Sequence, residues 1–129
     1  MIAEDYVSFE TAKLLKEKGF NAKCNKCYAY FADDDIRCLN LKYPKPAQSL
    51  IANRHPCITL QMAMKWLREV HELFISIGND DLDYNWQIFD IKNRDENLDP
   101  ICKSESYGGI CSYEIAVEEA IKYCLEHLI

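Results

Sequence analysis

Apolar positions recur with helical spacing in three segments of the chain, and all three segments open with the same pattern. Each opening is a Ser or Thr followed by a bulky apolar residue and then an acid or amide, with an alanine four residues after the Ser or Thr. The three opening residues are Ser8, Thr59 and Ser112. A Ser or Thr oxygen placed there can accept hydrogen bonds from the free amides of the first helical turn. The pattern predicts helices over about residues 8 to 18, 59 to 72 and 113 to 127.

The end of the first helix is marked by Gly19, which tolerates the left-handed conformation that follows a helix cap. Phe20 is then expected to fold back on Leu15. The third helix shows one clean apolar stripe. Its members are Ala116, Val117, Ala120, Ile121, Cys124 and Leu128.

The second helix has two apolar sides. Helical spacing predicts a core stripe of Leu60, Ala63, Met64, Leu67, Val70 and Phe74. Met62 and Trp66 lie four residues apart on another side and form a second apolar pair. Met and aromatic residues outside a core stripe are typical anchors of protein interfaces, although a sheet that covers both sides of the helix would explain them equally well.

Strand-like runs occupy the intervals between the helices. Residues 27–31 and 36–41 read as a hairpin around the turn 32–35, and a linker with Pro44, Pro46 and Pro56 follows. Residues 73–77 and 84–91 read as a second hairpin around the polar turn 78–83, with a weaker strand near Gly109–Cys111.

These elements predict an α+β fold in which three helices pack on a mainly antiparallel sheet of four or five strands, in the order α-β-β-α-β-β-(β)-α. We expect a single domain over residues 1–129. It could contain two αββ units, 8–58 and 59–111, closed by the helix at 112–128. The repeated helix openings suggest a duplication, but efficient N-caps resemble one another wherever they occur.

The composition suits a folded cytoplasmic protein. Of 129 residues, 49% are hydrophobic and 12% aromatic, which is enough to form a core. The first residues carry Glu4 and Asp5 where an export signal would carry basic residues, and no apolar run is long enough to span a membrane. Seven cysteines, an odd number, then indicate free thiols in a reducing compartment.

Net negative charge is concentrated in the second half of the chain. The formal net charge is −6, and the segment from Asp80 to Asp99 alone holds seven acids and two bases. Such a balance makes nucleic-acid binding unlikely, because that affinity grows with the number of phosphates neutralised. An alternative role is an acidic mimic of nucleic acid that binds a basic partner protein.

The sulfur-rich segment offers one candidate metal site. Zinc ligands could come from Cys24, Cys27, Cys38, His55 and Cys57. On a regular strand, however, Cys24 and Cys27 would face opposite sides, and the tight glycine-containing turns of zinc knuckles are missing. We therefore expect no cofactor, with zinc as the alternative to buried free thiols.

Enzyme fingerprints are not found. Phosphate-binding glycine loops and the Gly-x-Ser-x-Gly and His-Glu-x-x-His motifs do not occur in the sequence. Cys57 could be paired with His55 or His71, but residues two apart seldom direct their side chains at each other. We expect no catalytic residues and a non-enzymatic accessory protein that contacts another protein or a second copy of itself, with Met62 and Trp66 as contact residues.

The three helical stretches, residues 5–20, 59–71 and 112–128, resemble short uncharacterised proteins encoded in genomes and prophages of gut anaerobic bacteria. This resemblance implies no activity. Residues 59–128 also resemble a double-stranded-RNA-binding domain in the order of their elements only. Glu114, Glu118 and Glu119 lie where such a domain carries lysines, so the function is not transferred.

Overall fold

A computed structural model describes residues 4–80, 83–92, 99–105 and 109–129. The chain forms two compact units, Met1–Thr59 and Leu60–Ile129. Each unit combines helix with a three-stranded antiparallel sheet.

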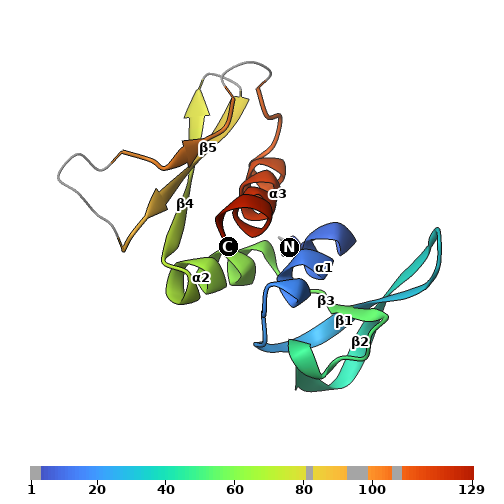
Figure 1. Ribbon diagram of the computed structural model, residues 1–129. Helices are drawn as coiled ribbons and strands as arrows, with labels where there is room; N and C mark the ends of the chain where they lie inside the picture. Colours follow the sequence, from blue (N-terminus) through green and yellow to red (C-terminus); the bar gives the residue numbers. More distant parts are fainter. Residues whose placement is uncertain (1–3, 81–82, 93–98, 106–108) are drawn as a thin grey trace. The chain divides into compact units, whose positions relative to one another are not determined.

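The first unit contains one α-helix and three strands (Figure 1). Its elements are α1 (Phe9–Glu17), β1 (Lys23–Ala32), β2 (Asp35–Pro46), the short 3-10 helix η1 (Ala47–Ser49) and β3 (Arg54–Pro56). The strand order is β2-β1-β3, so β1 is central. Because β3 pairs only with residues 27–29 of β1, the end of the β1–β2 hairpin continues past β3.

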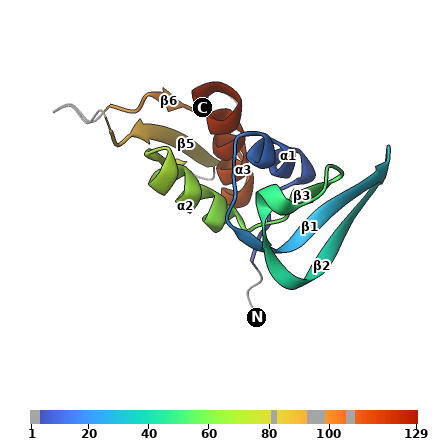
Figure 2. The same cartoon turned by 60° about the horizontal axis from the view of Figure 1, so that its bottom comes forward.

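The second unit places two α-helices with the other sheet. Its elements are α2 (Leu60–Val70), β4 (Leu73–Asp80), β5 (Asp83–Asp90), β6 (Cys102–Lys103), α3 (Tyr113–Tyr123) and a final π-helical turn η2 (Cys124–Leu128). The strand order is β4-β5-β6, and Figure 2 shows β6 beside β5. The helix α3 packs against β4, β5 and α2.

The predicted helix starts are confirmed. The Ser8 hydroxyl accepts from the Thr11 amide at 3.3 Å, and the Ser112 hydroxyl accepts from the Ile115 amide at 3.1 Å. The remaining predicted helix, α2, begins directly after Thr59. In each of α1 and α3, one of the four unpaired first-turn amides thus gains a side-chain acceptor.

The end of α1 also follows its prediction. Gly19 has a φ of +94°, and the Phe20 amide donates to the Leu15 carbonyl at 2.9 Å. The Gly19 amide donates to Lys16 at 3.2 Å. These two bonds define a Schellman ending, which requires the left-handed residue.

The α+β class is confirmed, but the prediction of one sheet with four or five strands is wrong. The described residues form six strands in two sheets. The strands β3 and β6 span three and two residues, which is too short to produce a hydrophobic period. Near Gly109–Cys111 only an isolated bridge between Ile110 and Tyr84 forms.

The predicted proline linker is largely strand. Pro44 and Pro46 lie within β2, which is an edge strand, and Pro56 ends β3. Proline is tolerated on a sheet edge because its missing N–H can face away from the ladder. The predicted turn 78–83 lies in part outside the described residues, at 81 and 82.

Each unit has its own buried core. Val7, Leu15 and Phe20 are fully buried in the first unit. In the second, the predicted α3 stripe is buried from Ala116 to Cys124, and Leu125 is buried as well. None of the helices in the described part of the chain is long and apolar enough to cross a membrane.

The two units share the order helix, hairpin, short strand, but they differ in pairing. The short strand β3 pairs with the first strand of its hairpin, whereas β6 pairs with the second. The second unit then continues into α3 and runs α-β-β-β-α. The proposed duplication stays a prediction.

Candidate functional site

The predicted zinc ligands lie in the first unit, where the pairing of β1 with β2 is irregular beside Cys24. Cys24 pairs with Lys45 and Lys26 pairs with Asn40, so the register shifts between these two positions. Cys24 and Cys27 are both buried, with two less buried residues between them. The shift leaves residues 41–44 of β2 opposite the single residue Asn25, so the extra residues lie on β2, and the expectation that Cys24 and Cys27 face opposite sides stays a prediction.

The candidate ligands Cys38, His55 and Cys57 lie on the opposite face of the sheet from Cys27. Tyr28 is paired with Cys38 on one side and with His55 on the other. Residues directly opposite each other in an antiparallel sheet share a face, and successive residues alternate, so this face is the one that Cys27 does not occupy. The sulfur atom of Cys57 lies 3.7 Å from that of Cys38.

The backbone of β1 therefore separates Cys27 from Cys38, His55 and Cys57. Within the described residues, no three His, Cys, Asp or Glu side chains are arranged to hold a metal ion. Burial raises the pKa of the Cys24 and Cys27 thiols, and it raises that of Cys57 to about 11. A thiol binds metal as the thiolate, so these shifts oppose metal binding at neutral pH.

The candidate catalytic pair, His55 and Cys57, is also poorly activated for nucleophilic attack. Burial, followed by the charges of Lys16 and Lys13, lowers the pKa of His55. A neutral histidine beside a protonated thiol lacks the ion-pair character of activated cysteine sites.

The contact residues predicted on the second helix lie on a more extensive apolar surface than expected. Leu60, Ala63 and Leu67 are buried as predicted. Val70 is 59% exposed and Phe74 is 42% exposed, so their assignment to the core stripe is wrong. The helix ends at Val70, which removes the helical spacing that placed Phe74 on that stripe.

Met62, Trp66 and Val70 form what we call the α2 stripe. They are four residues apart and therefore follow one face of the helix. Met62 is 41% exposed and Trp66 is half-buried. The Trp66 ring meets the His71 ring edge-on at 4.6 Å between centroids. This contact holds the indole in place beside an exposed apolar surface.

His71 lies at the end of the stripe and is mainly structural. Burial lowers its pKa, and within the described residues its Nε2 atom is buried without a hydrogen-bond partner. The imidazole is thus neutral and packs against the Trp66 ring.

A cleft in the first unit was not predicted from the sequence. We call it the α1 cleft; it has a volume of about 410 Å³. Its walls come from the start of α1, the end of the β1–β2 hairpin and the segment before β3. The lining residues are Phe9, Glu10, Lys13, Tyr30, Asp33, Asp34, Ile36, Ala52, Asn53 and His55. Since three distant segments form it, no local motif could have revealed it.

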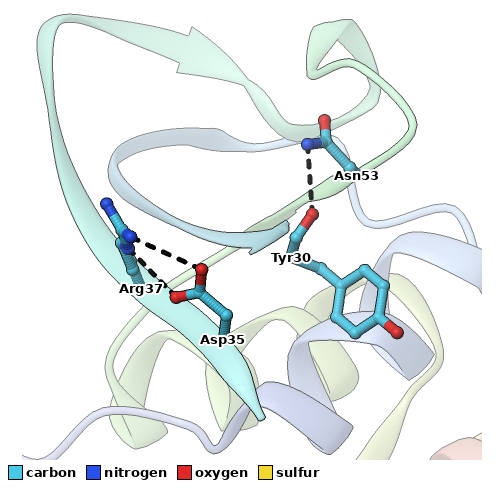
Figure 3. Close-up of polar contacts among 4 residues, drawn as sticks. All are labelled: Tyr30, Asp35, Arg37 and Asn53. Carbon is cyan, nitrogen blue, oxygen red and sulfur yellow. Dashed lines mark hydrogen bonds and ion pairs between the residues drawn. The ribbon is translucent and has the colours of Figure 1, made fainter. Parts of the chain in front are cut away.

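The walls of the cleft are joined by hydrogen bonds. The Tyr30 amide donates to the Asn53 carbonyl at 2.8 Å, and the Asn53 side-chain amide donates to the Tyr30 carbonyl at 3.2 Å (Figure 3). The Tyr30 hydroxyl donates to Asp33. The two bonds to Asn53 fix the hairpin end against the segment before β3, and the bond to Asp33 lies within the hairpin.

The acidic segment Asp80–Asp99, the candidate nucleic-acid mimic, lies partly outside the described residues at positions 81–82 and 93–98. Comparison of the chain with models of known protein families, with curated protein sequences and with solved structures found no match.

Proposed function

We propose that this protein acts by protein–protein contact rather than by catalysis, and that its α2 stripe associates with a second copy of the chain. The observation that carries the proposal is the exposure of Met62 and Val70, at 41% and 59%, on either side of Trp66 on one helix face. Tryptophan is among the residues that contribute most to binding energy in interfaces.

The stripe is symmetric about Trp66, which suits a twofold arrangement. If two α2 helices cross antiparallel at Trp66, Met62 of one copy lies against Val70 of the other. Lys65 and Glu69 are exposed and flank the stripe. The same crossing brings opposite charges from the two copies together at the rim, where they would favour the register.

The protonated state of the Cys57 thiol and the neutral state of His55 support a non-enzymatic role. Burial raises the pKa of the thiol to about 11 and lowers that of the imidazole. Neither group is prepared for nucleophilic catalysis.

Sedimentation of a Val70→Asp variant tests the proposal. We expect the wild-type chain to sediment as a dimer at about 100 µM, and the variant as a folded monomer, because an unpaired charge in an apolar interface is costly. The matched control is Ile115→Asp, which changes an apolar residue of α3 that is 47% exposed and lies outside the stripe. It should remain dimeric.

A Trp66→Asp variant separates an interface from a core role. A folded monomer supports the interface, whereas an unfolded chain shows that Trp66 is needed for the core. A wild-type monomer at the same concentration, or a Val70→Asp dimer, overturns the proposed self-association.

A further inference from the structure

We propose that the α1 cleft binds an organic cation: a guanidinium or ammonium group, carried either by a free amine or by an arginine or lysine side chain of a polypeptide. This site belongs to the first unit and is independent of the α2 stripe. Its volume of about 410 Å³ lies within the usual range of small-ligand pockets.

The charge of the lining favours a cation. Glu10, Asp33 and Asp34 place three carboxylates on the cleft, against the single ammonium group of Lys13. In the part of the chain that the structure describes, none of these three acids takes part in an ion pair.

The neighbouring ion pair does not neutralise the cleft. Arg37 donates to Asp35 at 3.0 Å, and neither residue lines the cleft (Figure 3). The Arg37 guanidinium group is thus engaged with a carboxylate outside the lining. The cleft keeps an excess of negative charge.

One wall of the cleft is aromatic. The rings of Phe9 and Tyr30 are stacked with 6.1 Å between centroids and an interplanar angle of 12°. The Lys13 ammonium lies 5.5 Å from the centroid of Phe9. Aromatic faces attract cations at this range, so the protein already holds one ammonium group against this wall.

The site is also held in shape before any ligand arrives. The Tyr30 hydroxyl is bonded to Asp33, and the Asn53 side chain is bonded to the backbone of Tyr30. A cleft whose walls are already ordered loses little conformational entropy on binding. Carboxylates accept hydrogen bonds only, which selects a ligand rich in N–H donors.

An NMR titration with agmatine, a small guanidinium amine, tests the site. We expect saturable shifts of the Tyr30, Asp34 and Asn53 amides. A Glu10→Gln/Asp34→Asn variant should weaken binding by about tenfold, since exposed charge pairs contribute modestly and two are removed. Asn suits position 34 because Asp34 has a φ of +69° and Asn tolerates that conformation.

Two further variants test whether the charge of the lining sets the affinity. Lys13→Met removes the competing positive charge and should strengthen binding by about threefold. The charge-matched control Glu69→Gln/Glu114→Gln changes two exposed acids of the second unit and should leave affinity unchanged.

A blocked tripeptide, acetyl-Gly-Arg-Gly-amide, distinguishes the two sources of the cation. Tighter binding of the tripeptide indicates a polypeptide ligand, and tighter binding of agmatine indicates a free amine. The proposal is overturned if shifts do not saturate by about 50 mM ligand, a very weak limit for a formed site, or if the variants and the control behave alike.

Discussion

The ammonium nitrogen of Lys16 on α1 lies 2.7 Å from the carbonyl oxygen of Arg54, the first residue of β3. The same nitrogen donates to the carbonyls of Leu50 and Ile51 at 3.1 and 2.9 Å. One side chain thus satisfies three carbonyls within residues 50–54, from the end of η1 to the start of β3. This contact joins α1 to a wall of the α1 cleft.

Replacing Lys16 by Met should destabilise the first unit by about 1–2 kcal/mol, because carbonyls that accept from a charged group lose their donor. Urea titration followed through the NMR amide signals of α1 and β1 measures this effect. Lys23→Met, at the exposed start of β1, is the control and should leave the midpoint unchanged. Equal midpoints for both variants would show that the Lys16 bonds contribute nothing.

Removal of the helix caps should weaken each unit separately. Ser8→Ala and Ser112→Ala each delete an acceptor for a first-turn amide, at a cost of about 1 kcal/mol. Ser8→Asp should retain the stability, since the carboxylate also caps and favours the helix N-terminus. Amide signals of α1 and α3 followed in urea report the two effects. A Ser8→Ala variant as stable as Ser8→Asp would contradict the capping role.

The helices could be predicted because their signals are local. Ser8, Ser112 and Gly19 act on amides and carbonyls within one or two turns, and the structure confirms each of them. The assignment of Val70 failed for a tertiary reason. The helical period places Val70 on the same side as Leu67. Val70 is, however, the last residue of α2 and lies at the surface.

The candidate sites depended on features that local patterns do not report. Next to Cys24, residues 41–44 of β2 lie opposite one residue of β1, and such a register shift has no reliable sequence signature. The strand β3, of only three residues, brought His55 to the same face as Cys38. The α1 cleft required the contact between Tyr30 and Asn53, which are far apart in the sequence.

The seven cysteines should differ strongly in reactivity. Cys38 and Cys111 are exposed, whereas Cys57 and Cys124 are buried with thiol pKa values raised to about 11 and about 12. Only the thiolate reacts with alkylating agents, so the exposed pair should be labelled first at neutral pH. Peptide mass spectrometry after brief iodoacetamide treatment identifies the labelled residues, and labelling in urea is the control. Early labelling of Cys124 would contradict its burial.

Protein purified without chelator should retain little zinc, below about 0.1 ion per chain, because a formed structural site would keep close to one. The physical reason is the separation of Cys27 from Cys38, His55 and Cys57 by the β1 backbone. Metal analysis measures the content. A value near one ion per chain, lost in Cys27→Ser and kept in Cys111→Ser, would instead support the zinc alternative.

Stability should fall on the alkaline side because of the buried Cys124 thiol. Burial, followed by the charge of Cys102, raises its pKa to about 12, whereas a thiol in an unfolded chain has a pKa of about 8.5. Below the lower value both states hold the proton and the contribution is fully present. As the pH rises above it, only the unfolded chain ionises, so the free energy of unfolding decreases until the folded thiol titrates. One such group changes the free energy of unfolding by at most about 1.4 kcal/mol per pH unit.

Urea titrations between about pH 8 and 10 measure this slope in the range where the unfolded thiol titrates. Cys124→Ala should flatten it, whereas Cys111→Ala, which alters an exposed thiol, should not. Identical slopes in the wild type and Cys124→Ala would mean that Cys124 does not control alkaline stability.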